Sequence, residues 1–193
     1  MKLTNTNQSY GLIAKSFHWI TAMLFAVSYV AIYFREWLAQ SEFENWFAIQ
    51  LHMSVGISIG VIVILRILWR TLDPVPTNET KSQLIVVSKR LVHFSLYAIM
   101  FTMPITGYLS IANYLHSGGG KIDFFFVYDL DFSGDIEIQK VAGTTIESLE
   151  KVAELVHVFL GKWIAGLLII LHVFAGSYHH FIRKDDTLRK MFF

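Results

Sequence analysis

Four long apolar stretches dominate the chain, and shorter polar segments separate them. Each stretch has about 18 residues or more and few charges, which is the length that an α-helix needs to cross a bilayer. Because they nearly fill the 193 residues, the pattern predicts an all-α fold, a four-helix transmembrane bundle that forms one integral membrane domain over residues 1–193. The predicted helices cover residues 12–38, 51–69, 91–112 and 155–181.

Two connections between the stretches carry turn-forming residues. The segment DPVPTNET (residues 73–80) contains two prolines, which resist helix continuation and predict a turn-rich linker. The longest connection, an outer loop at residues 113–150, contains three consecutive glycines followed by KIDFFFVYDLDFSGD, which predicts a short lid with hairpin character. The first apolar stretch is too long for a signal peptide and is expected to remain as a helix.

Composition supports a membrane protein and narrows its chemistry. The chain is 54% hydrophobic and only 16% charged, which is more apolar and less charged than an ordinary soluble domain. It has no cysteine, which excludes disulfides, iron–sulfur clusters, thiolate ligation of haem and the covalent attachment of c-type haem. Any haem would be held non-covalently, as in a b-type cytochrome. The basic residues lie at membrane edges and give no reason to expect nucleic acid as a partner.

The distribution of basic residues predicts the orientation. With four spans both termini lie on one side, and 11 of the Lys and Arg residues fall on that side against 5 on the other. The positive-inside rule therefore predicts cytoplasmic termini. Acidic residues are distributed the other way, so the inner face has a net charge of +7 and the outer face −6.

Four histidines lie inside the apolar stretches, where an ionisable or ligating side chain is expensive and usually functional. Alternate helices run in opposite directions, so depth pairs His18 with His172 near the inner face. The same reasoning pairs His52 with His157 near the outer face. Two imidazoles at equal depth on facing helices are suited to be the axial ligands of a bis-histidine haem, and such a site favours electron transfer over oxygen binding. The pattern predicts two stacked haems.

The spacing on the fourth helix is compatible with this arrangement. His157 and His172 are 15 residues apart, which corresponds to about 22 Å along the axis and about 60° around it. Both can therefore face the bundle interior within a hydrocarbon core of about 30 Å. Two alternatives stay open: hydrogen-bonded core histidines, or a haem-free transporter or zinc- or copper-binding protein. Apart from Glu36 near the outer end of the first span, the spans contain no carboxylate that would complete a shell for zinc or copper.

Further residues near the inner face are candidates for contacts with haem propionates or a quinone. His93 competes as a ligand of the inner iron, although its position close to Arg90 favours an interfacial or quinone-contacting role. Arg66 and Arg70, one turn apart, suit haem propionates but also fit ordinary positive-inside anchors. The other candidates are His179 and His180, which can equally be interfacial residues, and more weakly Lys15 and Trp19.

Small residues and a proline punctuate two of the helices. Gly56 and Gly60 form a G-x-x-x-G pattern after His52, which permits close approach of either a porphyrin face or another helix. Pro104 predicts a kink in the third helix.

The stretches around these residues resemble the bacterial cytochrome b561 family, and within it the superoxide oxidase branch. The resemblance covers all four predicted helices. It implies a bacterial inner-membrane protein with two b haems on the four paired histidines, which takes electrons from periplasmic superoxide and reduces ubiquinone. The matching stretches are FHWITAML, LHMSVGISIGVIVILRILWR followed by DPVP, HFSLYAIMFTMPITGYL and LHVFAGSYHHFIRKDDTLRKMF.

Two features depart from what the resemblance implies. The spacing from His157 to His172 is one residue longer, which a π-bulge in the fourth helix would absorb. The negative outer face opposes the steering of an anion such as superoxide, unless the outer cations form a local positive funnel. Those cations are Arg35, Lys121, Lys140, Lys151 and Lys162.

Together these observations favour a di-haem electron-transfer oxidoreductase that connects a small outer donor to quinone. The alternative is a haem-bearing membrane anchor and electron conduit for a partner redox enzyme such as a hydrogenase, with the acidic outer loops as the docking surface.

Overall fold

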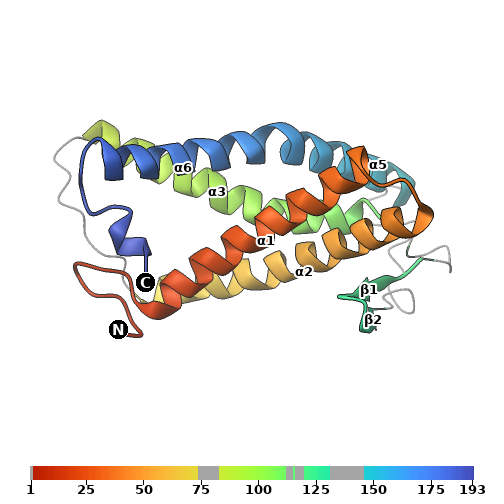
Figure 1. Ribbon diagram of the computed structural model, residues 1–193, viewed down its shortest axis with the longest axis horizontal. Coiled ribbons are helices and arrows are strands. Elements are labelled where there is room, and N and C mark those ends of the chain that lie inside the picture. The colour runs from red at the N-terminus through yellow and green to blue at the C-terminus, as the bar shows by residue number, and fades with distance from the viewer. Residues whose placement is uncertain (1, 74–82, 112–114, 116–119, 131–145) are drawn as a thin grey trace.

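Four long apolar helical segments run along the longest axis of the molecule (Figure 1). The computed structural model describes residues 2–73, 83–111, 115, 120–130 and 146–193. Each segment is long and apolar enough to cross a membrane, which confirms the predicted four-helix transmembrane bundle. The segments are α1 (Leu12–Trp37), α2 (Glu42–Leu72), α3 (Gln83–Leu109) and a continuous one made of α5 (Ile146–Phe159), the π-helix η2 (Leu160–Ala165) and α6 (Gly166–Phe181).

The second helix extends beyond the apolar run, residues 51–69, that predicted it. It begins at Glu42 because Ser41 and Glu44 form a capping box, in which Ser41 Oγ accepts from the Glu44 N–H and the Glu44 carboxylate accepts from the Ser41 N–H. It ends at Leu72, and the extended backbone of Asp73 is the conformation favoured before a proline. The third helix likewise begins at Gln83, before the predicted residue 91. Hydropathy marks the span, whereas capping and turn residues mark the ends of the helix.

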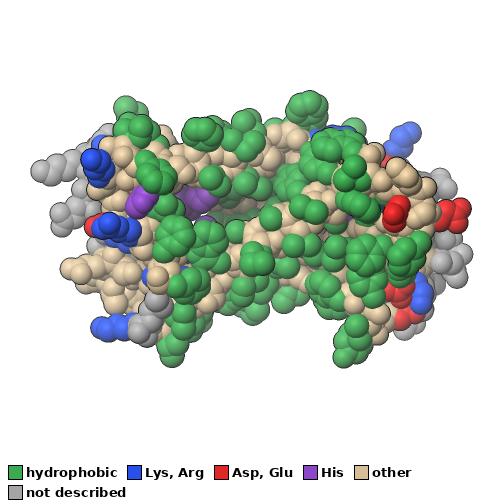
Figure 2. Space-filling view, viewed as in Figure 1, with side chains coloured by type: hydrophobic (Ala, Val, Ile, Leu, Met, Phe, Trp, Pro, Cys, Tyr) green, Lys and Arg blue, Asp and Glu red, His purple; other side chains and the backbone are tan. Residues whose placement is uncertain are grey.

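Large hydrophobic side chains cover the sides of the bundle, and charged side chains gather at its two ends (Figure 2). Val30, Phe94 and Phe174, from three different helices, are each 70–72% exposed. Such a surface is the face that a membrane protein presents to lipid. The buried core is small and lies between α2 and α3: Val55, Ile59, Val63 and Met100.

Both chain termini lie at the same end of the bundle, called here the termini end (Figure 1). The C-terminal segment folds back onto the first turns of α1. The buried amine of Lys15 donates to the carbonyl of Phe192, and Trp19 Nε1 donates to the carbonyl of Met191 at 2.9 Å. A short 3₁₀-helix, η3 (Arg189–Met191), shapes this segment.

An antiparallel hairpin of β1 (Ile122–Phe124) and β2 (Tyr128–Leu130) lies beside α2 at the opposite end, called here the hairpin end (Figure 1). It agrees with the hairpin character predicted for the long outer connection. Most of that connection, including His116, lies outside the described residues, as does the linker after Asp73.

Candidate functional site

At the hairpin end, His52 of α2 lies beside His157 of α5, with 6.0 Å between their ring centroids. His52 Nδ1 is 3.2 Å from the carbonyl oxygen of Ser28 and 3.0 Å from its hydroxyl. His157 Nδ1 is 3.1 Å from the carbonyl of Met103 and 3.1 Å from Thr106 Oγ1. A carbonyl only accepts, so each Nδ1 carries the hydrogen and each Nε2 presents a lone pair. This is the tautomer in which histidines bind metals through Nε2.

Two glycines leave space around His52 and His157. A Cβ added to Gly107 of α3 would lie 2.9 Å from His157 Cε1, so only glycine allows the ring to pack this closely. Gly56 lies one turn from His52, and a Cβ added there would meet nothing within 4 Å. By contrast, a Cβ on Gly60 would lie 3.3 Å from Pro104, so Gly60 serves the packing of α2 on α3.

Three histidines, not two, gather at the termini end. His18 of α1 lies 6.2 Å from His172 of α6, as their depths predicted, and His93 of α3 lies 5.6 Å from His172 on ring centroids. His93 Nδ1 donates to the carbonyl of Lys89 at 2.6 Å, so His93 Nε2 also presents a lone pair. His93 is thus part of the cluster.

Two arginines stand against this cluster. Arg66 donates to His18 Nδ1 at 3.3 Å, and the guanidinium groups of Arg66 and Arg70 lie over the ring of Tyr97 at 5.3 and 5.4 Å. A guanidinium only donates, so His18 Nδ1 is the acceptor, the opposite of the role that Nδ1 has at the hairpin end. Among the described residues no carboxylate pairs with either arginine.

The remaining histidines predicted at the inner face are engaged elsewhere. His179 pairs with the Asp185 carboxylate in the turn after α6. Partial burial opposes ionisation of Asp185, but hydrogen bonds from His179 and Thr187 outweigh it and lower the pKa of Asp185 to about 2. His180 packs against Phe181, with 4.8 Å between ring centroids.

The extra residue between His157 and His172 is taken up by the π-helix η2, as the spacing suggested. One residue absorbed there leaves the two histidines related as if 14 residues apart, or about 40° around the axis. Tyr29 donates its hydroxyl to the carbonyl of Gly161 within the π-helix at 2.7 Å. Lys162 pairs with Glu36 of α1 at 3.3 Å. Side chains of α1 thus hold the irregular segment.

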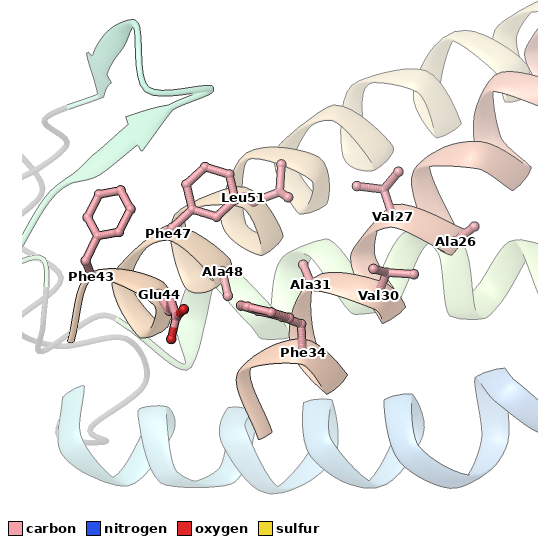
Figure 3. A pocket seen from close by; sticks show the side chains of 10 residues that line it. All are labelled: Ala26, Val27, Val30, Ala31, Phe34, Phe43, Glu44, Phe47, Ala48 and Leu51. Carbon is pink, nitrogen blue, oxygen red and sulfur yellow. The ribbon is translucent and has the colours of Figure 1, made fainter. Parts of the chain in front are cut away.

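An apolar groove of about 380 Å³ lies between α1 and α2 at the hairpin end (Figure 3). Its walls include Val27, Phe34, Phe47 and Leu51, with Glu44 as the charged member. No histidine lines this groove, so it is separate from both clusters. Across the described residues no three His, Asp or Glu side chains, the three histidines at the termini end included, are arranged to hold one metal ion together.

Sequence reasoning missed the residues that support the histidines: Ser28, Tyr29, Thr106 and Gly107. The signal available was a small or polar residue inside an apolar span, which is unusual enough to require a partner. Which partner such a residue contacts depends on how the helices are rotated against one another, and the sequence does not show this rotation.

Comparison with known proteins gives a consistent family. The model of the prokaryotic cytochrome b561 family matches residues 9–193. Cytochrome b561 homolog 2 of Escherichia coli is 31% identical, over 99% of this chain and 95% of the relative. The probable superoxide oxidase CybB of Yersinia pestis is 25% identical, over 96% of each chain, and cytochrome b561 homolog 1 of Escherichia coli is 24% identical, over 90% of this chain and 91% of the relative.

The match thus extends over all four helices and both histidine clusters, and the chain belongs to the prokaryotic cytochrome b561 family, whose members carry electrons in the membrane with b-type haem.

Proposed function

We propose that this protein carries electrons across the bacterial inner membrane through two b haems, one at each histidine cluster, from a small periplasmic donor to ubiquinone. His52 with His157 would hold the haem at the hairpin end, and His18 with His172 would hold the haem at the termini end. The observation that carries the proposal is the paired rings, whose centroids are 6.0 and 6.2 Å apart.

These distances suit one metal between two imidazoles. Imidazole nitrogens bind metals at about 2 Å, so two rings on opposite sides of one ion have centroids roughly 6 Å apart. The open space at Gly56, one turn from His52, leaves room for a flat cofactor beside the ligand. The haem supplies one-electron redox chemistry when bound.

The chain's own residues orient and balance that group. The carbonyls of Ser28 and Met103 fix the rings of His52 and His157. At the termini end, a haem held by His18 Nε2 would leave the hydrogen on Nδ1, so Arg66 would no longer donate to His18 and would be free to bind a carboxylate. Arg66 and Arg70 would then hold the haem propionates, a pairing that planar guanidinium groups make well.

The quinone is proposed to bind at the termini end, where His93 stands beside His172 with Nε2 open. His179 and His180 are weaker candidates because they contact Asp185 and Phe181. Cytoplasmic termini are part of the proposal, supported by the charge asymmetry of 11 basic residues against 5.

Superoxide is the proposed donor, supported by the resemblance and by the name of the Yersinia relative. The charges do not favour steering by the lysines that the structure pairs: Lys121 pairs with Asp123 and Asp129, and Lys162 pairs with Glu36. Of the remaining candidates for a funnel, Arg35 lies on α1, Lys151 lies on α5 and Lys140 lies outside the described residues. The donor is therefore the part of the proposal to test most directly.

The test uses the purified, haem-loaded protein in nanodiscs. A pyridine haemochrome spectrum should give two b haems per chain, and superoxide should drive ubiquinone reduction that superoxide dismutase abolishes. A chain without haem would overturn the proposal. Two haems without superoxide-driven reduction would remove superoxide as donor and leave transmembrane electron transfer standing.

An electron-conduit subunit is the second candidate, favoured by the net charge of −6 on the outer face. A basic redox partner would dock there through complementary charge. Stable co-purification of such a partner, lost at high salt, would favour this function over a self-sufficient oxidase.

A further inference from the structure

Two polar residues of α2 are buried beneath the hairpin. Gln50 and Ser54 are 1% and 0% exposed. Gln50 donates from Nε2 to the carbonyl of Lys121 at 3.1 Å and accepts at Oε1 from the Asp123 N–H at 2.9 Å. Ser54 Oγ accepts from the Phe125 N–H at 2.9 Å. Since Ser54 lies one turn further from the hairpin end than Gln50, the hairpin runs along α2 with its tip toward the middle of the bundle.

The hairpin covers the side of α2 that faces away from the histidine pair. Gln50 and Ser54 are about 40° apart around the helix, whereas His52 is about 160° from each of them. Lipid would otherwise meet these two polar side chains, and a polar group without a partner is costly in lipid. The hairpin backbone satisfies them, and in turn they satisfy a non-helical backbone beside the membrane.

The hairpin replaces that polar surface with an aromatic one. Its turn residues Phe125 and Phe126 have φ of 48° and 62°, a region that hinders side chains and that turns usually fill with Gly or Asn. Phe126 stacks on Phe47 of α2, with 4.6 Å between ring centroids and 3° between ring planes. Val127 and Tyr128 next to the turn are 72% and 68% exposed. Large apolar side chains at positions with a strained backbone indicate that these side chains have a function.

The ion-paired residues of the hairpin lie toward its base, away from the aromatic tip. Lys121 at its base forms ion pairs with Asp123 at 3.2 Å and Asp129 at 3.1 Å. The apolar run of α2 begins at Leu51, immediately after Gln50, so the base lies where the helix leaves the hydrocarbon core. The backbone of Phe125 reaches Ser54, one turn deeper, while the Phe126 ring turns back onto Phe47. A charged base and an aromatic tip match the polarity gradient of a membrane interface.

We propose that the hairpin is an interfacial membrane anchor, whose tip Phe125–Tyr128 inserts among the lipid headgroups and upper acyl chains on its side of the bilayer. The exposed surface of the tip continues the apolar face that α2 already presents to the membrane. The anchor thereby seals the outside of α2 at the level of His52. The proposal depends on the transmembrane bundle and is independent of the donor and acceptor.

Because the chain has no cysteine, one introduced cysteine can be labelled uniquely. Val127→Cys places an environment-sensitive fluorophore at the tip without removing an aromatic residue, and Lys121→Cys places it at the base as the control. Each variant is reconstituted with haem in phosphatidylcholine–phosphatidylglycerol nanodiscs, with or without lipid that carries a doxyl group near the headgroup. For each variant, the fluorescence intensity with doxyl lipid is divided by the intensity without it, and this ratio cancels quenching by haem.

The expected result is quenching by doxyl lipid about twofold or more stronger at residue 127 than at residue 121, and quenching by aqueous iodide in the reverse order. Equal doxyl quenching, or iodide reaching residue 127 as easily as residue 121, would overturn the proposal. A second variant, Phe125→Asn with Phe126→Gly, keeps a turn and removes the aromatic residues. It should reduce doxyl quenching at residue 127 toward the value at the base, and unchanged quenching would contradict the role of the aromatic residues.

Discussion

The two ends of the bundle surround their paired histidines differently. At the hairpin end, the carbonyl oxygens of Ser28 and Met103 accept hydrogen bonds from His52 and His157. At the termini end, the cation Arg66 donates to His18, and a further histidine stands beside His172. Carbonyl acceptors make an imidazole a stronger electron donor to its metal, whereas nearby cations favour the reduced metal. With a haem at each pair, as proposed, this difference would favour electron flow from the hairpin end to the termini end.

Replacing one histidine of each pair should have the largest effect. His157→Ala removes a proposed ligand at the hairpin end and His172→Ala removes one at the termini end, so each variant should retain one of the two proposed haems. Pyridine haemochrome content and low-temperature difference spectra should show that the two variants lose different haems. His180→Ala, which leaves both clusters intact, is the control and should retain both. A His157→Ala protein with two haems would show that the pairing is wrong.

Gly107→Leu should disturb the hairpin-end site almost as much, because a Cβ alone would already lie 2.9 Å from His157 Cε1. The displaced ring should weaken or abolish haem binding at that end only, which the haem-to-protein ratio measures. The matched control is Gly176→Ala, whose Cβ would meet Leu188 at an ordinary 3.7 Å. Normal haem content and spectrum in Gly107→Leu would contradict the close packing.

Arg66→Gln tests the electrostatic part of the comparison. Loss of the cation beside His18 should lower the midpoint potential of the termini-end haem by tens of millivolts and leave the other haem unchanged. Potentiometric titration of the protein in nanodiscs measures both potentials, and the single-haem histidine variants assign them. Arg70→Gln removes an equal charge that does not contact His18, so its effect should be smaller. Equal shifts of the midpoint potential in the two variants would show that Arg66 acts through its charge alone and not through its position beside His18.

Tyr29→Phe should have the smallest effect. It removes the hydroxyl that satisfies the Gly161 carbonyl in the π-helix and should cost about 1 kcal/mol of stability. A thermal unfolding scan of the haem-loaded protein should show a lower Tm, with the hairpin-end haem lost first because η2 follows His157. Tyr33→Phe, one turn along α1, is the control. An identical Tm for the two variants would show that the Tyr29 hydroxyl does not stabilise the π-helix.

Much of the architecture was predictable because its causes are local. Runs of apolar residues predicted the four spans, and the family resemblance was confirmed over residues 9–193. The ends of α2 were predicted less well, because the capping box at Ser41 and Glu44 lies outside the apolar run. The depth of each histidine followed from its place along its helix, and the structure brings the predicted partners together.

By itself, then, the sequence determined the number of spans, the common side of both termini and the depth of each histidine, because hydropathy and helical rise depend only on position along the chain. Only the tertiary structure decided that His93 joins His172, that Arg66 rather than a carbonyl meets His18, and that the hairpin covers Gln50 and Ser54. These contacts depend on how each helix is rotated about its axis. That rotation is set by side-chain packing between residues far apart in sequence, such as Gly107 against His157.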